Sequence, residues 1–234
     1  LSTKDRLIAY LPRWAPWAAR MPWLANLRDT MPGAAWLSER WLGFAAQRSL
    51  PKWRRETFLR RDSKPRDIGS QAASSRPPDV VLFVDTFTNY FEPENAHAAL
   101  AVLRAAGYAV EVARPVAADA EPRRPLCCGR TYLSAGLVDE AKAEARRMVA
   151  ALLPHAERSA AIVGLEPSCL FSLRDEFLVM GLGDAAQRIA SRAFMIEEFL
   201  ASEQRAGRLR LPLRPLADGA RALVHGHCHQ KAFG

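Results

Sequence analysis

Four cysteines and a cluster of histidines are the residues of this chain with the most specific chemistry. They lie in three short stretches, PLCCGR, EPSC and HGHCH, which supply Cys127, Cys128, Cys169, His227, Cys228 and His229. Thiolates and imidazoles are common zinc ligands, and an iron–sulfur cluster needs several thiolates from different loops. The adjacent cysteines lack the C-x-x-C spacing of a redox dithiol, and a disulfide between them would need a strained turn. The residue types therefore predict a metal centre, with thiols buried as small apolar side chains as the simpler alternative.

The residues around these stretches predict the elements that position them. Short apolar runs predict buried parallel strands at residues 80–85, 108–113, 160–166 and 221–226, and amphipathic stretches between them predict helices, one of them over 184–204. Strands and helices that alternate in this way form a parallel sheet with helices on both faces. PLCCGR follows the second predicted strand, EPSC the third and HGHCH the fourth. Because parallel strands end at one edge of a sheet, we expect all four cysteines to gather there.

Charge and aromatic residues divide the chain into two unlike parts. Residues 1–67 contain 14 Lys and Arg but only 6 Asp and Glu, so they carry the whole net charge of +8. They also contain all six tryptophans, and prolines break them into short predicted helices, the clearest over 34–47. We therefore expect a basic, Trp-rich helical extension at 1–60, a linker at 61–78 rich in Ser, Pro and Arg, and a cysteine-rich α/β domain at 79–234.

The composition also restricts where the chain works and what it binds. No apolar run is long enough to span a membrane, and the N-terminus has no signal-peptide pattern. Four cysteines in a chain of 234 residues do not make a secreted disulfide scaffold, so we expect a cytoplasmic location. The tryptophans and arginines of the extension suit a membrane surface or packing on a neighbouring domain. Nucleic acid is not expected as a partner, because no nucleic-acid-binding motif is present.

The cysteine motifs together resemble a known family. PLCCGRTYLSAGLVDEA, GLEPSC and HGHCHQKAFG resemble the cysteine-rich CCG domain. That domain occurs in the iron–sulfur subunit of glycolate oxidase, in FAD-linked D-lactate dehydrogenases and, more distantly, in heterodisulfide reductase. The resemblance covers residues 79–234 and implies a three-layer α/β half domain that binds an iron–sulfur cluster of the [4Fe–4S] type. The ligands that it implies are Cys127, Cys128, Cys169 and Cys228, with His227 and His229 as further metal-binding residues.

The same resemblance implies an electron-transfer role. The chain is then a segment of an FAD-dependent D-2-hydroxyacid oxidoreductase, with the flavin and ferredoxin-type domains elsewhere in the same polypeptide or complex. Electrons pass from the flavin through iron–sulfur centres toward a quinone or cytochrome, and we expect a peripheral position on the inner face of the cell membrane. The segment alone is expected to be inactive, because the flavin that oxidises the substrate lies outside it.

Two departures from the family pattern leave alternatives open. The family carries its motif twice, and Phe87 stands where the second repeat has Cys228. The second repeat stops at Gly234, so we expect this chain to be part of a longer polypeptide. The first repeat then offers three thiolates. A degenerate repeat that only packs other domains together is therefore one alternative, and a zinc site at HGHCH is another.

Four other residues near the motifs have two interpretations each. We expect Glu166 to anchor its loop rather than to contact a ligand. Asp85 and Thr86 orient a ligand or cap the following turn. Arg130, directly after the CCG turn, neutralises a thiolate site or is an ordinary surface arginine.

Overall fold

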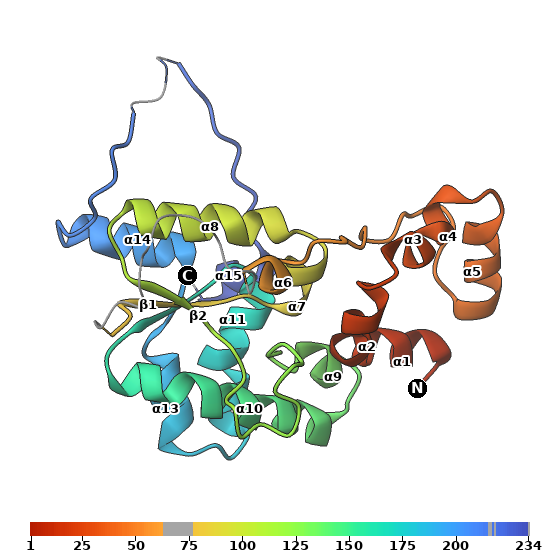
Figure 1. The fold of residues 1–234 in the computed structure, drawn as a ribbon, viewed down its shortest axis with the longest axis horizontal. Coiled ribbons are helices and arrows are strands. Elements are labelled where there is room, and N and C mark those ends of the chain that lie inside the picture. The colour runs from red at the N-terminus through yellow and green to blue at the C-terminus, as the bar shows by residue number, and fades with distance from the viewer. Residues whose placement is uncertain (63–76, 215–216, 218, 234) are drawn as a thin grey trace.

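The computed structural model of the chain describes residues 1–62, 77–214, 217 and 219–233 (Figure 1). Short helices come first, and strands and helices alternate after them. In chain order the elements are α1 (Thr3–Ala9), α2 (Leu11–Ala18), α3 (Pro22–Ala25), α4 (Leu27–Thr30), α5 (Ala34–Leu42), α6 (Phe58–Asp62), β1 (Val80–Phe83), α7 (Thr86–Tyr90), α8 (Pro93–Ala105), β2 (Val110–Val112), α9 (Arg130–Ser134), α10 (Val138–Glu157), β3 (Ala161–Gly164), α11 (Pro167–Arg174), α12 (Glu176–Val179), α13 (Asp184–Ala190), β4 (Ala193–Met195), α14 (Ile196–Arg205) and α15 (Cys228–Phe233).

The four strands form one parallel sheet in the order β2–β1–β3–β4. Val80 of β1 pairs with Val110 of β2 and with Ala161 of β3, and β3 pairs with β4 on its other side. Both central strands, β1 and β3, are buried along their whole length. A strand buried on both faces reads as a continuous apolar run, as these two do. The α/β fold with a parallel sheet, preceded by short proline-broken helices, is therefore confirmed.

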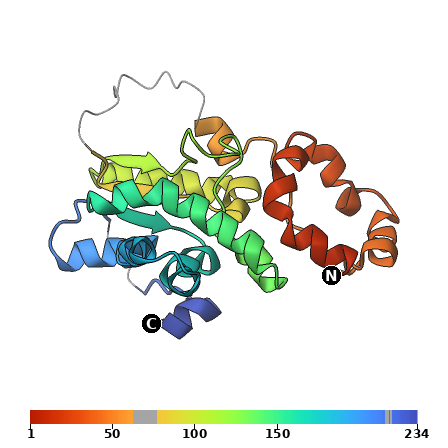
Figure 2. The same cartoon turned by 90° about the horizontal axis from the view of Figure 1, so that it is seen from below.

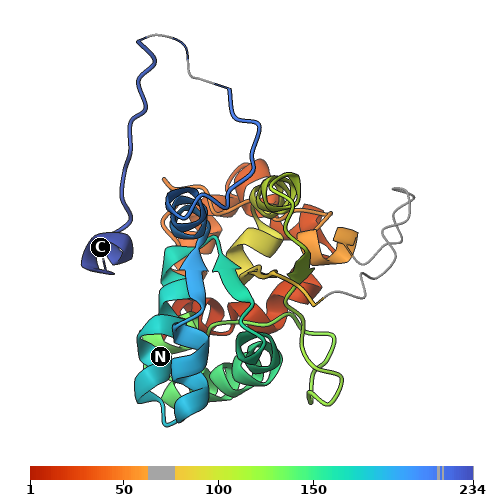
Figure 3. The ribbon, with the colours of Figure 1, turned by 90° about the vertical axis from the view of Figure 1, so that its left-hand side faces the viewer.

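Successive side chains of β1 enter two different cores, because neighbours along a strand point to opposite faces. Val81 and Phe83 pack in a core formed with α9, α10, α11 and α13. Val80 and Leu82 pack in a second core formed with α6, α8 and α14. Figure 1 shows α8 and α14 on one side of the sheet and α10 and α13 on the other, and Figure 3 shows the same layers from the side. The molecule therefore has three layers around its sheet.

The first three predicted strands are confirmed with shorter bounds, but the predicted fourth strand is wrong. Residues 221–226 form no strand, and Leu223 and Val224 are almost fully exposed. The fourth strand is β4, which interrupts the helix predicted over 184–204. The amphipathic helices α13 and α14 flank only three extended residues, so helical periodicity dominates this stretch. Pairing with a distant strand makes residues 193–195 extended. β4 lies beside β3, and the Arg192 carbonyl accepts a hydrogen bond from the Ile162 N–H at 2.7 Å.

The N-terminal extension consists of α1 to α5, which lie beside the α/β part in Figure 2. Pro12 and Pro22 occupy the first turns of α2 and α3, where a missing N–H costs nothing. The helix predicted over 34–47 ends earlier, at Leu42, because Gly43 takes a left-handed conformation with φ +77°. Neither these helices nor the others that the structure describes have the length and apolar character needed to cross a membrane.

The boundary predicted at residue 60 falls inside α6, which belongs by its contacts to the α/β part. Phe58 of α6 is completely buried in the core that also contains Val80 and Leu82. The predicted linker, 61–78, lies mostly outside the described residues.

Candidate functional site

Three of the four cysteines meet at the carboxyl edge of the sheet. Cys127 and Cys128 lie in the loop before α9, and Cys169 lies in the first turn of α11, just after β3. All three are buried, with exposed fractions of 2–3%. Cys128 is in hydrogen-bonding contact with both of the others. The predicted convergence of these three thiols at one edge is therefore confirmed.

Contact and burial raise the pKa values of all three thiols. The hydrogen bond with Cys128, together with burial, raises the pKa of Cys127 well above its usual value. Contact with Cys127 lowers the pKa of Cys128, but contact with Cys169 and burial outweigh it and raise that pKa as well. Contact with Cys128 lowers the pKa of Cys169, but burial and the nearby carboxylates of Asp85 and Glu166 raise it to about 12. The three groups are therefore protonated near neutral pH, and a metal would have to displace their protons.

The turn that presents the adjacent cysteines depends on Gly129. Its φ of +80° is left-handed, and a Cβ at this position would lie 3.1 Å from backbone atoms of Ala141 in α10. Glycine therefore allows both the conformation and the close approach of the two segments. The Gly129 N–H donates to the Cys127 Sγ at 3.4 Å, and the Arg130 N–H is hydrogen-bonded to the Cys128 sulfur. Such donors favour a negatively charged sulfur once the proton is lost.

Two carboxylates beside the thiols cap helices. Asp85 accepts from the Phe87 N–H at 2.8 Å and the Thr88 N–H at 3.0 Å, which caps α7. Glu166 accepts from the Ser168 N–H at 3.1 Å and caps α11 in the same way. Burial raises the pKa of Asp85 although its hydrogen bonds oppose the rise. Of the roles predicted for these carboxylates, the structure supports capping and loop anchoring.

A pocket of about 610 Å³ opens beside Cys169. The helices α7, α9, α11 and α15 contribute its walls, together with Glu166 shortly after β3 and the extension. Residues that line it include Ile8, Pro51, Phe87, Arg130, Glu166, Cys169, His227 and His229. The pocket thus combines one buried thiol with two carboxylates (Glu92 and Glu166), a guanidinium and two imidazoles.

Arg130 links the CCG turn to α12 and α15. Its guanidinium forms an ion pair with Glu176 and lies 3.1 Å from the His229 Nε2. Burial, and then the positive charge of Arg130, lower the pKa of His229, so this imidazole is neutral near pH 7. The other ring nitrogen of His229 is buried and has no hydrogen-bond partner among the described residues. Arg130 is therefore a structural link within the pocket wall, and His229 keeps one polar atom for a further contact.

Cys228 does not join the other three cysteines. It is exposed at the start of α15, a helix that packs against α11. The strand predicted at 221–226, which was expected to place Cys228 at the sheet edge, does not exist, and Cys228 is not part of the buried thiol cluster. His227 and His229 do line the pocket beside Cys169. Within the described ranges, however, no group of three or more His, Cys, Asp and Glu side chains is arranged to hold a metal ion, so these residues do not by themselves complete such a site.

The extension forms part of this site, which no sequence pattern indicated. Thr131 of α9 donates to the Ala9 carbonyl at 2.9 Å, and the Tyr10 hydroxyl donates to Glu140 at 2.9 Å. Ile8 and Pro51 line the pocket itself. The two hydrogen bonds join residues more than a hundred positions apart, and local periodicity carries no information about such contacts.

Protein-family models, curated proteins and solved structures were compared with this chain, and none of the three comparisons finds a match.

Proposed function

We propose that this chain is the electron-transfer segment of an FAD-dependent D-2-hydroxyacid oxidoreductase of the D-lactate or glycolate type. The CCG motif supports the proposal, and one structural observation carries it: Cys169, in the first turn of α11, lies against Cys128, in the loop before α9. Thiols that converge from separate segments are the donor set of an iron–sulfur centre. In this proposal Cys127, Cys128 and Cys169 supply part of the ligand set of a [4Fe–4S]-type cluster.

The residues around the thiols suit this role in three ways. Burial excludes water from the sulfurs. The N–H groups of Gly129 and Arg130 donate to two of them and favour the thiolate form that binds metal. An iron–sulfur cluster supplies one-electron transfer when it is bound, and the protein contributes ligation, hydrogen bonds and a low-dielectric surrounding.

The remaining parts of the proposal concern partners and location. The FAD is placed on another domain of the same polypeptide or complex, and the electron acceptor is a quinone or a cytochrome. We propose a cytoplasmic protein at the inner face of the cell membrane, where the basic extension meets the lipid surface. The exposed side chains of Trp17, Trp23, Trp36 and Trp41 favour that surface, because tryptophan prefers membrane interfaces.

A structural repeat without its own cluster is the second candidate. Two observations favour it: the described residues hold no metal-binding group of three or more, and the three thiols have raised pKa values. The same residues then fill the core at the sheet edge as small apolar side chains. Zinc is a third candidate, since His227 and His229 line the pocket beside Cys169.

Iron and acid-labile sulfide analysis of the intact, anaerobically purified protein, with electron paramagnetic resonance, separates these candidates. We expect both iron and sulfide, and we expect Cys169→Ser to reduce them strongly. Cys228→Ser is the matched variant, because it removes the one exposed cysteine. Iron that survives both Cys127→Ser and Cys169→Ser, or protein that binds no iron, contradicts the electron-transfer proposal and supports the structural repeat. Stoichiometric zinc without sulfide supports the zinc site.

A further inference from the structure

The helix α5 presents an exposed face of large apolar side chains. Trp36, Leu37 and Trp41 are 47–79% exposed, and Arg40 beside them is exposed as well. Because successive residues of an α-helix are about 100° apart, these four side chains fall within an arc of about 140° on one side of the helix. We call the surface formed by Trp36, Leu37, Arg40 and Trp41 the α5 face.

The opposite side of α5 is held by the rest of the extension. The Arg28 Nε donates to the Ser38 Oγ at 3.1 Å, and the Ala46 N–H donates to the Glu39 Oε2 at 3.2 Å. Ser38 and Glu39 both lie on the side of the helix away from the α5 face. These contacts join α5 to α4 and to the segment that follows it, so the α5 face points outward.

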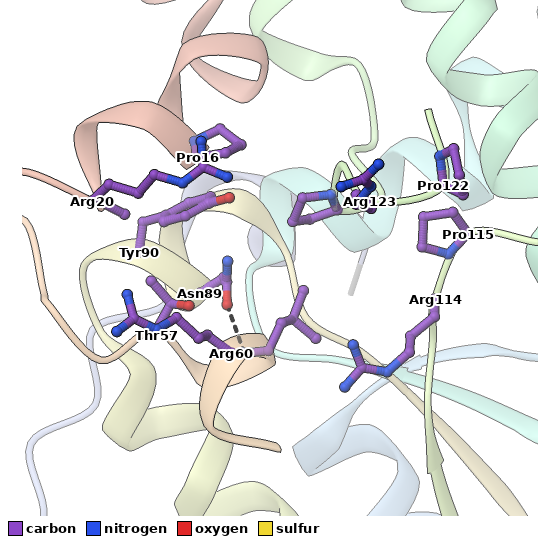
Figure 4. Close-up of a pocket in the computed structure, with 13 residues that line it drawn as sticks. Pro16, Arg20, Thr57, Arg60, Asn89, Tyr90, Arg114, Pro115, Pro122 and Arg123 are labelled. Atoms are coloured by element: carbon purple, nitrogen blue, oxygen red, sulfur yellow. Dashed lines mark hydrogen bonds between the residues drawn. The ribbon is translucent and has the colours of Figure 1, made fainter. Parts of the chain in front are cut away.

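The extension is attached to the α/β part through α2. Leu11, Ala15 and Ala19 pack with Tyr90 of α7 in one apolar cluster. Figure 4 shows this junction, where Pro16 and Tyr90 line a pocket of about 480 Å³. Figure 1 shows α5 at the end of the molecule away from the sheet. The α5 face therefore lies where a broad external surface can reach it.

The segment that carries the α5 face is strongly basic. Residues 20–55 contain seven Lys and Arg but two Asp and Glu, so their net charge is +5. The two acidic residues, Asp29 and Glu39, accept hydrogen bonds within the extension, and Arg54 is paired with Glu94 of α8. Arg40 lies within the α5 face itself. An apolar face in a basic segment suits a surface that offers both apolar and negatively charged groups.

We propose that the α5 face is the membrane-contact site of this protein and that it binds bilayers containing anionic phospholipids. The Trp and Leu side chains enter the boundary between headgroups and acyl chains, and Arg40 stays level with the phosphate oxygens. A helix of nine residues is too short to span a bilayer, so α5 lies in the plane of the surface.

This inference rests on the membrane location in the proposed function and assigns the contact to one helix. It uses none of the thiol-site residues, so the two proposals fail separately. Protein that binds no iron but binds anionic vesicles through the α5 face contradicts electron transfer alone. Protein that holds a cluster but binds no vesicles contradicts the α5 assignment alone.

Co-sedimentation of the intact protein with large unilamellar vesicles tests the site. One set of vesicles is pure phosphatidylcholine, and the other contains about 30% phosphatidylglycerol. We expect at least about tenfold tighter binding to the anionic vesicles. Binding should weaken severalfold when sodium chloride rises from about 50 mM to about 300 mM, because salt screens the charges. Absence of binding to the anionic vesicles overturns the proposal.

The double variant Trp36→Ser/Trp41→Ser localises the contact. Both side chains are exposed, so the fold should survive their loss, and circular dichroism checks that it does. We expect binding to anionic vesicles to weaken at least about tenfold, because apolar area no longer enters the interface. The control, Leu178→Ser/Val179→Ser, removes exposed apolar side chains from α12 and should stay within about twofold. Equal weakening in both variants contradicts the assignment.

The variant Arg40→Gln tests the preference for anionic lipid. We expect about fivefold weaker binding to the anionic vesicles and a change within about twofold on pure phosphatidylcholine. Arg104→Gln, at an exposed position of α8, is the matched control and should change neither. Sedimentation velocity without vesicles examines the competing occupant. A dimer that Trp36→Ser/Trp41→Ser abolishes would assign the α5 face to a second copy of the chain and overturn the proposal.

Discussion

The α/β part buries its large apolar side chains, whereas the N-terminal extension leaves several of its largest ones exposed. Around the sheet, large side chains such as Phe83 and Phe177 are at most 1% exposed. In the extension, Trp17, Trp36 and Trp41 are 63–79% exposed although they are the largest apolar residues of the chain. A sheet presents two broad faces that helices can cover, whereas helices of four to nine residues cannot form a second layer on one another. Hydrophobic composition alone therefore does not decide burial.

The extension is fastened to the α/β part by a few defined contacts. The Trp53 ring packs against Trp14, Tyr90 and Phe91, with ring centroids 4.6–6.0 Å apart. The backbone N–H of Arg54, the next residue, donates to the Tyr90 carbonyl of α7 at 3.0 Å. Since all six tryptophans lie in the extension, tryptophan fluorescence reports on this part, while circular dichroism is dominated by the helices and strands of the rest. The two regions can thus be followed separately in one experiment.

The largest difference should appear between Phe83→Ala and Trp41→Ala. Phe83 fills the core between the sheet and α10, so we expect its loss to lower the free energy of unfolding by about 4 kcal/mol. Trp41 is exposed, and we expect a change within about 0.5 kcal/mol. Urea unfolding followed by circular dichroism measures both. A cost for Trp41→Ala close to that of Phe83→Ala would mean that the extension is packed far more closely than its exposure indicates.

Buried charge gives the next largest contrast, between Glu144→Gln and Asp29→Asn. Glu144 is 1% exposed and binds both Arg124 and Arg147, so its neutralisation leaves two guanidinium groups without their shared carboxylate. We expect a loss of about 3 kcal/mol. Asp29 pairs with Arg28 in the extension, but Arg28 also donates to the carbonyls of Ala45 and Arg48, so we expect about 1 kcal/mol or less.

Thermal unfolding monitored by circular dichroism for Glu144→Gln, and by tryptophan fluorescence for Asp29→Asn, checks these values. Equal melting-temperature shifts in the two variants would contradict the view that the Glu144 ion pairs are more deeply buried than the Asp29 pair.

Two glycines, one in each region, have the same left-handed backbone conformation. Replacing each with alanine distinguishes the cost of backbone strain from the cost of a packing clash. Gly129 (φ +80°) and Gly33 (φ +79°) both disfavour a side chain, which costs about 1 kcal/mol for alanine. A Cβ on Gly129 would also press on the backbone of Ala141, whereas one on Gly33 would meet nothing within 4 Å. We expect Gly129→Ala to destabilise by about 2–3 kcal/mol and Gly33→Ala by about 1 kcal/mol in urea unfolding. A cost for Gly33→Ala as large as for Gly129→Ala would exclude packing as the source of the difference.

The smallest effect concerns the contact between Tyr10 and Glu140, and it depends on pH. The hydrogen bond to Glu140 raises the pKa of Tyr10, so its stabilising contribution is present below the unfolded pKa near 10 and is lost as the pH rises through the folded value. Tryptophan fluorescence should therefore report loosening of the extension above about pH 10, before the circular dichroism changes.

Tyr10→Phe should remove this pH step and leave a small constant loosening. Tyr108→Phe, which removes a hydroxyl bound to Glu203 in the α/β part, is the matched control and should leave the fluorescence step unchanged. A step that persists in Tyr10→Phe would assign it to another group.

Local patterns in the sequence were enough to predict the α/β class, three of the four strands and the meeting of three thiols. β1 and β3 are apolar runs that are buried on both faces, and such runs have few alternatives to a central parallel strand. Cys127, Cys128 and Cys169 follow real strands, so the direction of a parallel sheet brings them to one edge.

Contacts between distant segments, in contrast, set the position of β4, the exposure of Cys228, and which arginines form buried ion pairs. β4 is extended because β3 offers hydrogen-bonding partners beside it, and its three residues carry too little periodicity to predict that. Cys228 follows exposed residues instead of a strand, so sheet direction does not place it. Arg123 and Arg124 are neighbours with identical side chains, and their opposite surroundings depend on which one faces Glu144 across the folded chain.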